Sequence, residues 1–337
     1  GLEIFINKRI PTEAGLGGGS ADAAAVLRLW NTAGAQTMGY APQSAEGLDA
    51  LLLRHPDFSE KHSFVLTDAD GVRGFVSGVT GDALAQGRVR GYFSCLLLDP
   101  AADSDENTAL LLAALEDSFL AAGKSVAAVT CFNPVRLPWI IPSTDGHQHN
   151  NMPGIPTDTA LSRRMLALGW VEATTEQAMH LDLSGFQYPE KMREKERKMA
   201  ENGYFVDWYR EGVHQGVDEM VESLNNSMWS EEIPPAAHNG MRLLVGLEGN
   251  TVAGFTGPVY PEPTGRGYFA GIAVGPSFQN HGLGSLLFYK LCQAEKDCGA
   301  RYMSLFTGIN NHAQNIYKSW ELKASELYSA IYDTLVD

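Results

Sequence analysis

The chain has 337 residues, 44% of them hydrophobic, with 40 acidic against 25 basic residues and a net charge of −15. This length favours two domains, and the apolar fraction is typical of a folded globular protein. The acidic excess argues against nucleic acid as a partner, because phosphate binding needs a basic surface.

Other features exclude further classes of protein. No apolar run approaches the roughly 20 residues that a bilayer span requires, so we expect no membrane contact. The first residues form no basic and apolar leader, which predicts no export and a cytoplasmic location. The four cysteines form no CxxC pair, and we expect no bound metal.

The N-terminal segment contains a glycine run at 15–19 followed by Ser20. It resembles the ATP phosphate loop of the GHMP small-molecule kinases, but the resemblance covers only about the first 31 residues, and we find no later glycine motif of that family. We interpret the segment as a strand (Glu3–Asn7), a glycine-rich connection and the first helix of a larger domain. Kinase activity is kept as a third hypothesis.

The most informative feature is an internal repeat. The tetrapeptide Arg-Gly-Tyr-Phe at 90–93 recurs at 266–269, an offset of 176 residues, and each copy continues into an apolar run that ends in proline. The same offset relates Gly123 to Gly299, and each glycine ends a helical pattern. Two copies of one fold explain this order better than chance.

Each copy is predicted to contain a strand meander followed by helices that alternate with strands. This order indicates an α/β (α+β) fold with a mixed sheet and helices on both faces. We place the boundary near 184–188, which gives domains 1–185 and 186–337, and interpret 189–201 as a solvated helix. Expected strands of the first copy lie at 64–67, 72–75, 90–98 and 178–183, and those of the second at 243–246, 252–255, 266–274, 302–306 and 327–331.

The second copy contains a strand, a glycine-containing turn and a helix start in succession. The strand Ile272–Val274 leads through Pro276 into residues 279–285, which open the next helix. Glycines let backbone N–H groups approach a ligand, and a helix N-terminus favours negative charge. This arrangement predicts a cradle for a phosphate or pyrophosphate.

Two motifs in this copy point to one family. The pattern Val-x-Pro-x-x-Gln-x-x-Gly-x-Gly, at 274–284, strongly resembles the acetyl-CoA pyrophosphate loop of the GNAT acetyltransferase superfamily. Residues 310–317 resemble that family's Asn-x-x-Ala-x-x-x-Tyr helix. With the internal repeat, the chain is identified as two tandem GNAT-type acyl-CoA N-acyltransferase domains.

The resemblance implies a role for each matching residue. The amides around the glycines would hold the pyrophosphate, the preceding strand would pair with the pantetheine arm, and Tyr317 would protonate the departing thiolate. One departure is Glu321-Leu322, which stands where many members have Gly-Phe. The expected acetyl-CoA-binding residues are Ile272, Ala273, Val274, Gln279, Asn280, His281, Gly282, Leu283, Gly284, Ser285 and Asn310.

A general base is not evident from the sequence. The nearest acids are Glu262, in the loop before the third strand, and Glu248, in a hairpin. We interpret each as a solvated loop carboxylate.

The first copy lacks the loop. At the offset of 176, Asp103 replaces Gln279, Glu106 replaces Gly282 and Thr108 replaces Gly284. Carboxylates at a helix start repel a pyrophosphate, so we expect this copy not to bind acyl-CoA.

We therefore predict an acetyl-CoA-dependent N-acetyltransferase that acts by direct transfer on a primary amine of a small molecule or peptide. The acidic balance favours a cationic acceptor such as a polyamine, an aminoglycoside or a basic peptide. Either a monomer or a homodimer is compatible with the sequence. The alternative is a non-catalytic protein that binds acyl-CoA or another small molecule.

Overall fold

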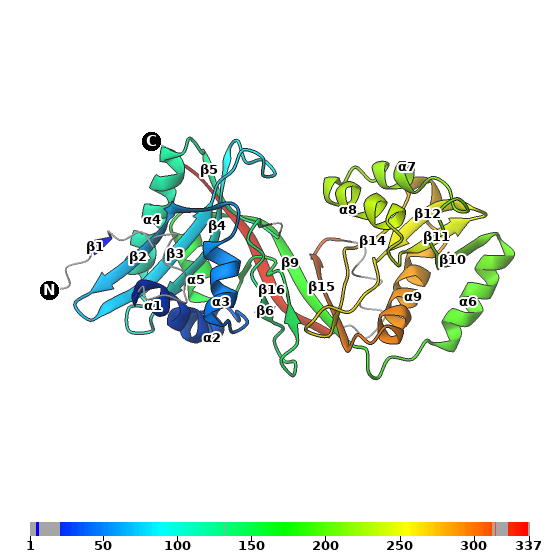
Figure 1. The fold of residues 1–337 in the computed structure, drawn as a ribbon, viewed down its shortest axis with the longest axis horizontal. Helices are drawn as coiled ribbons and strands as arrows, with labels where there is room; N and C mark the ends of the chain where they lie inside the picture. Colours follow the sequence, from blue (N-terminus) through cyan, green and yellow to red (C-terminus); the bar gives the residue numbers. More distant parts are fainter. Residues whose placement is uncertain (1–4, 7–20, 132, 312–313, 315–322, 336–337) are drawn as a thin grey trace. The chain divides into compact units, whose positions relative to one another are not determined.

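The computed structural model describes residues 5–6, 21–131, 133–311, 314 and 323–335. The chain divides into two compact units. Figure 1 colours the chain by residue number, so the residues of each unit can be found in it. Unit 1 comprises residues 1–178, 306–309 and 325–337, and unit 2 comprises residues 179–305 and 310–324. Within the described ranges, no helix combines the length and apolarity that crossing a bilayer requires.

Unit 1 is built on a mixed sheet with the strand order β1-β2-β3-β4-β5-β16-β9, in which β16 (Lys323–Thr334) comes from the far end of the sequence. Helix α4 packs on one face, where Leu111 meets Gly74, and the π-helix Trp30–Gly34 packs on the other, with Gly34 against Leu97. The elements of unit 1 are β1 (Phe5–Ile6), α1 (Ala21–Leu29), α2 (Ala35–Thr37), α3 (Ala45–Leu48), β2 (Phe58–Asp68), β3 (Gly71–Val79), β4 (Arg90–Leu98), α4 (Asp105–Ala121), β5 (Val126–Val129), β6 (Trp139–Ile140), β7 (Gln148–His149), β8 (Ile155–Pro156), α5 (Ala160–Ala167) and the start of β9 (Val171–Asp182).

Helix α1 belongs to the core of unit 1. Its Ala23, Val26 and Leu29 are buried, as expected if the segment that resembles a kinase loop supplies the first helix of this fold. The glycine run before it lies outside the described residues.

Unit 2 contains a four-stranded sheet with the order β10-β11-β12-β14. Alternate residues of β11 point to opposite faces: Leu244 packs with α9, and Val245 and Leu247 pack with α7 and α8. The elements of unit 2 are α6 (Glu190–Glu201), β10 (Tyr204–Trp208), α7 (Val217–Glu222), α8 (Ser227–His238), β11 (Leu244–Glu248), β12 (Thr251–Thr256), β13 (Arg266–Gly267), β14 (Ile272–Val274), α9 (Leu283–Asp297) and most of β15 (Tyr302–Gly308).

The strand pairing confirms the internal repeat. In both units the strand that begins with Arg-Gly pairs in parallel with the strand after the long helix, and its later residues pair antiparallel with the Gly-Phe strand. Partners related by the repeat are Arg90 with Val126 and Arg266 with Tyr302, then Gly74 with Leu98 and Gly254 with Val274. The mixed sheet predicted from the sequence is thereby confirmed.

The last strand of the chain differs from the expected arrangement. Strand β16 (Lys323–Thr334) was expected to complete the second copy, but its residues Ile331–Thr334 pair antiparallel with β5 of unit 1. Conversely, β9 starts in unit 1 and its residues from Met179 onward belong to unit 2. Because the two copies have matching sheets, a strand of one can satisfy the hydrogen bonds of the other. The boundary at 185/186 stays a prediction, whereas contacts divide the chain after Ala178.

The charged segment 189–201 is helical, as predicted, but it is not fully solvated. Helix α6 buries Met192 and Met199 in the same core cluster as Leu283 and Leu286 of α9. The two methionines are seven residues apart, which places both on one face of the helix. Charged residues cover the rest of α6, and they concealed this apolar face in the sequence.

Candidate functional site

The strand predicted over 266–274, whose last three residues are expected to bind acetyl-CoA, pairs with one strand at its start and with a different strand at its end. Strand β13 pairs in parallel with β15, and three residues of β14 pair antiparallel with β12. Between them, residues 268–271 form no strand, whereas the equivalent β4 of unit 1 is continuous. Among the strands that the structure describes, β14 is the last of its sheet, and Ile272, Ala273 and Val274 are only half-buried. The edge beyond β14 can accept an extended ligand by backbone pairing.

A tryptophan from α8 occupies the break in the strand. The Trp229 indole N–H donates to the Ala270 carbonyl at 3.1 Å, and the ring lies edge-on to Phe255 at 5.5 Å. Gly271 has φ +152°, and a Cβ there would lie 2.6 Å from the Trp229 nitrogen. Only glycine fits this position without moving the indole.

The loop between β14 and α9 is open at the start of the helix. A short 3₁₀ turn (Pro276–Phe278) leads into Gln279, Asn280 and His281, which are exposed, and Asn280 has a left-handed φ of +67°. Gly282, with φ +83°, is the N-cap of α9 and supplies no side-chain acceptor. First-turn N–H groups of a helix without a capping side chain are suited to bind an anion.

The sides of this loop come from other elements of unit 2. The His281 ring stacks on Tyr204 of β10 with a centroid distance of 4.5 Å and an interplanar angle of 18°. Tyr204 donates its hydroxyl to Glu248, and this hydrogen bond raises the pKa of Tyr204. Inside the helix, Leu283 is buried, and Gly284 and Ser285 are half-buried.

Glu248 and Glu262, the two acids considered above as a general base, have different environments. Glu248 is exposed, as expected. Glu262 is not a solvated loop carboxylate, because it accepts a hydrogen bond from Arg266 at 2.9 Å, and the Arg266 side chain is only 3% exposed. Arg266 also donates to the Ser304 hydroxyl at 2.9 Å. The sequence prediction failed here because a buried arginine four residues away holds this carboxylate in place.

A further buried acid lies on α9. Glu295 is fully buried next to Gly267, and one of its carboxyl oxygens has no hydrogen-bond partner. Burial raises the pKa of Glu295 to about 8, because ionising a carboxyl in an apolar environment is costly. In the described part of the chain, no group of three or more His, Cys, Asp or Glu side chains could hold a metal.

The remaining predicted residues lie after β15. Asn310 is exposed in the turn that follows β15. Tyr317, the predicted general acid, and Glu321-Leu322 lie outside the described residues. Of the predicted residues that the structure describes, those between 272 and 285 lie together, on the strand edge, in the turn and at the helix start.

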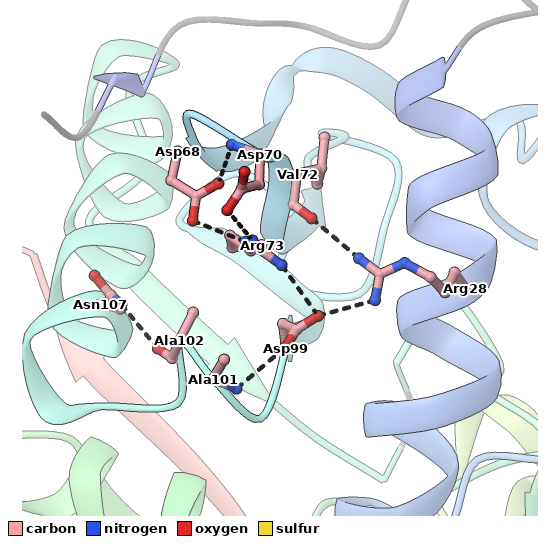
Figure 2. Close-up of polar contacts among 9 residues, drawn as sticks. All are labelled: Arg28, Asp68, Asp70, Val72, Arg73, Asp99, Ala101, Ala102 and Asn107. Carbon is pink, nitrogen blue, oxygen red and sulfur yellow. Dashed lines mark hydrogen bonds and ion pairs between the residues drawn. The ribbon is translucent and has the colours of Figure 1, made fainter. Parts of the chain in front are cut away.

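The equivalent loop of unit 1 is filled by its own side chains. Figure 2 shows Asp99 at the end of β4, accepting hydrogen bonds from Arg28 of α1 at 2.9 Å and from the Ala101 amide at 3.1 Å. Arg73 lies 3.9 Å from the same carboxylate, and Asn107 donates to the Ala102 carbonyl at 2.8 Å. These contacts tie the loop to α1, to β3 and to the start of α4.

The helix start in unit 1 is also capped and neutralised. Ser104 accepts a hydrogen bond from the Asn107 amide at 3.1 Å, which satisfies a first-turn N–H group. Arg164 of α5 forms ion pairs with Asp103 and, at 2.7 Å, with Asp105. A cavity of about 260 Å³ beside these groups is lined by Leu96, Leu98, Thr108, Asp158 and Leu161, among others.

Sequence reasoning missed the neighbours of the loop that are remote in the chain. Lys195 of α6 lies against Gly282, and Trp229 of α8 lies against Gly271. For Lys195 a signal existed, because it is spaced three residues after Met192 and four before Met199, on the apolar face of α6. No sequence pattern indicates that Trp229 meets the strand.

Comparison with known families agrees with this geometry. Residues 217–320, which include the loop, match the acetyltransferase (GNAT) family. Residues 1–41 match the N-terminal domain of the GHMP kinases. In that segment the chain is 66% identical over 35 residues to 4-diphosphocytidyl-2-C-methyl-D-erythritol kinase of Ligilactobacillus salivarius, covering 9% of this chain and 12% of the kinase. Such short coverage agrees with the interpretation of this segment as the start of a larger domain that is not a kinase.

Solved structures extend the fold likeness over both units. The chain superposes with a TM-score of 0.68 and 16% identity on a GCN5-related glucosamine N-acetyltransferase region in a fungal multi-domain GH3 β-N-acetylglucosaminidase, over 99% of this chain and 38% of that one. It superposes with a TM-score of 0.57 and 14% identity on a tandem GNAT protein from the clavulanic acid biosynthesis pathway, over 100% and 99% of the two chains. At these low identities, the superpositions show a shared fold.

Proposed function

Because residues 217–320 match the acetyltransferase (GNAT) family, we propose that unit 2 transfers an acetyl group from acetyl-CoA to a primary amine of a small molecule or peptide. The observation that supports this most is the change of partner between β13 and β14, directly before an uncapped helix start. This combination presents a free strand edge and a set of N–H groups in one continuous segment.

In this proposal each part of the segment binds one part of acetyl-CoA. The backbone of Ile272–Val274 pairs with the amide groups of the pantetheine arm. The amides around His281–Ser285 hold the pyrophosphate, for which the glycines leave room. Gln279 and Asn280 line the approach to the helix start, and Asn310 makes a further contact with the donor.

The reaction we propose is a direct transfer. The amine nitrogen attacks the thioester carbonyl carbon, a C–N bond forms, the C–S bond breaks, and the departing thiolate takes a proton. Tyr317 is the proposed proton donor, because a phenol remains protonated at neutral pH. The amine proton passes to solvent, and none of the acids described above is assigned as a base.

The acceptor side of the site supports a cationic amine. The Tyr268 hydroxyl, three residues before the glycine at the strand break, donates to Glu232 of α8 at 2.5 Å. Tyr260 stacks on Tyr268 with a centroid distance of 4.6 Å, and Tyr260 is 36% exposed. A carboxylate beside two phenol rings attracts a positive charge by ion pairing and by cation–π interaction.

Unit 1 is proposed to support the fold without binding acyl-CoA. Its strand β4 has no break, its helix start is capped by Ser104, and Arg164 already pairs with the carboxylates of the loop. An incoming pyrophosphate would meet carboxylates in place of free N–H groups.

Calorimetric titration with acetyl-CoA tests the proposal. We expect one binding event for the wild type and none for the double variant Gly282→Glu/Gly284→Thr, which copies the unit 1 loop. Gly240→Glu is the matched control, since Gly240 also has a positive φ, of +72°, and a side chain there meets open space. Two binding events, or binding that survives in the double variant, would contradict the assignment of a single site in unit 2.

Thiol release from acetyl-CoA then tests turnover. A polyamine, an aminoglycoside and a basic peptide are offered as acceptors to the wild type. Release that depends on the amine supports the enzyme. Tight binding without release for any amine would favour the alternative, a non-catalytic acyl-CoA-binding protein.

A further inference from the structure

The glycine at the start of α9 lies beneath a lysine from a different helix. A Cβ at Gly282 would lie 2.7 Å from Lys195 Cε and 2.8 Å from Lys195 Nζ. The ammonium group therefore sits directly over the backbone of the loop. The left-handed φ of +83° favours glycine at position 282, where the absence of a side chain keeps the backbone accessible to the lysine.

Helix α6 holds Lys195 in this position. Met192 and Met199 flank it on the same face, and both are buried in the core cluster that contains Leu283. The Met199 sulfur also lies 3.8 Å from the Cβ position of Gly282. Lys195 is half-buried as a result, and burial lowers its pKa.

The charge of Lys195 is not balanced by the protein. Its neighbours on α6 pair with carboxylates, Arg193 with Glu190 at 3.6 Å and Lys198 with Glu194 at 2.8 Å. Among the residues that the structure describes, no carboxylate lies within ion-pair distance of Lys195. This is unexpected in a chain with 40 acidic and 25 basic residues.

The position is also electrostatically unfavourable without an anion. The N-terminus of α9 carries a partial positive charge from the helix dipole, and the ammonium group lies beside it. The loop 275–285 contains no Lys or Arg. A ligand with negative charge between the ammonium and the helix start would satisfy both.

We propose that Lys195 binds a phosphate of the acyl donor and supplies the cationic side chain that the loop lacks. This inference rests on the proposed function, because it assigns a donor-binding residue to the same site. In this proposal Lys195 contacts the pyrophosphate of acetyl-CoA and makes no contact with the thioester.

The test compares two donors in two variants. Lys195→Gln and Lys198→Gln remove a charge from the same helix, and Lys198 is exposed and paired with Glu194. Each variant and the wild type are titrated with acetyl-CoA and with acetyl-pantetheine, which has the thioester arm but no pyrophosphate. We expect Lys195→Gln to weaken acetyl-CoA binding by about 10- to 100-fold, the effect of one charge-assisted contact, and to leave acetyl-pantetheine binding unchanged. Lys198→Gln should bind both donors as the wild type does.

The outcomes separate this inference from the proposed function. If the wild type binds no acetyl-CoA, the proposed function fails and the inference fails with it. If the wild type binds and Lys195→Gln binds equally well, or loses both donors to the same extent, only the inference is overturned. Lys195→Arg, which keeps the charge, should retain most of the affinity and shows whether a loss reflects charge or misfolding.

Discussion

Glu295 provides a quantitative prediction of how pH and one substitution change stability. The carboxyl is fully buried and has one oxygen without a partner, and burial raises its pKa to about 8. In the unfolded chain a glutamate titrates near 4.5. Between these values the folded protein keeps a proton that the unfolded chain releases. Stability is therefore lost as pH rises from the unfolded to the folded pKa.

The magnitude follows from the difference in pKa. Each pH unit in this interval costs about 1.4 kcal/mol, so that at pH 7 the buried acid lowers the free energy of unfolding by about 3 kcal/mol. Glu295→Gln has nearly the same shape and needs no proton. The variant should therefore gain stability over the wild type by about 1.4 kcal/mol per pH unit between pH 5 and pH 8.

Urea-induced unfolding at pH 5, 6, 7 and 8 measures this difference. Glu231→Gln on α8 is the control, since Glu231 is exposed. A constant offset between Glu295→Gln and the wild type at all four pH values would refute the reasoning, because a side chain that fits badly gives a loss without a pH slope.

Three further predictions concern the acceptor side, the strand break and an exposed histidine. Glu232→Gln should raise KM for a cationic amine by about tenfold and leave the affinity for acetyl-CoA unchanged, as steady-state kinetics and titration would show. Gly271→Ala should lower the free energy of unfolding, measured in urea, by about 1–3 kcal/mol, because its Cβ meets Trp229. The loss of stability should be smaller for Gly299→Ala, where φ is +96° but no atom lies within 4 Å of the Cβ position. Hydrogen bonds to two carboxylates raise the pKa of His238, so its stabilisation is full below the unfolded pKa and is lost as pH rises through the folded pKa. The wild type should therefore lose thermal stability relative to His238→Gln when the pH is raised from 6 to 9, and equal changes in both would contradict this.

Local sequence patterns predicted the repeat, the mixed sheet and the loop. The tetrapeptide at 90–93 and 266–269 marks equivalent strands, and the pairing registers differ by the same 176 residues. The glycine spacing at Gly282 and Gly284 indicates a turn into a helix, and both lie at the start of α9. These features depend on neighbours in the chain, which a single sequence contains.

Features that depend on distant neighbours could not be predicted. The spacing from Met192 and Met199 places Lys195 on the apolar face of α6, but only the packing of α6 against α9 brings it to Gly282. Glu262 resembles any loop acid until Arg266 is seen to be buried. The partner of β16 is not encoded in its alternation, because two matching sheets offer the same edge.

The pairing of β16 with β5 also bears on synthesis of the chain. The residues that pair with Val126–Val129 are Ile331–Thr334, about 200 positions later, and at about 5–20 residues per second they are made some 10–40 s afterwards. Throughout that interval the edge of β5 is without its native neighbour, and unpaired edges invite association with other strands. The ribosome and the chaperones near it therefore meet an unfinished sheet in unit 1 until the residues of β16 have been made.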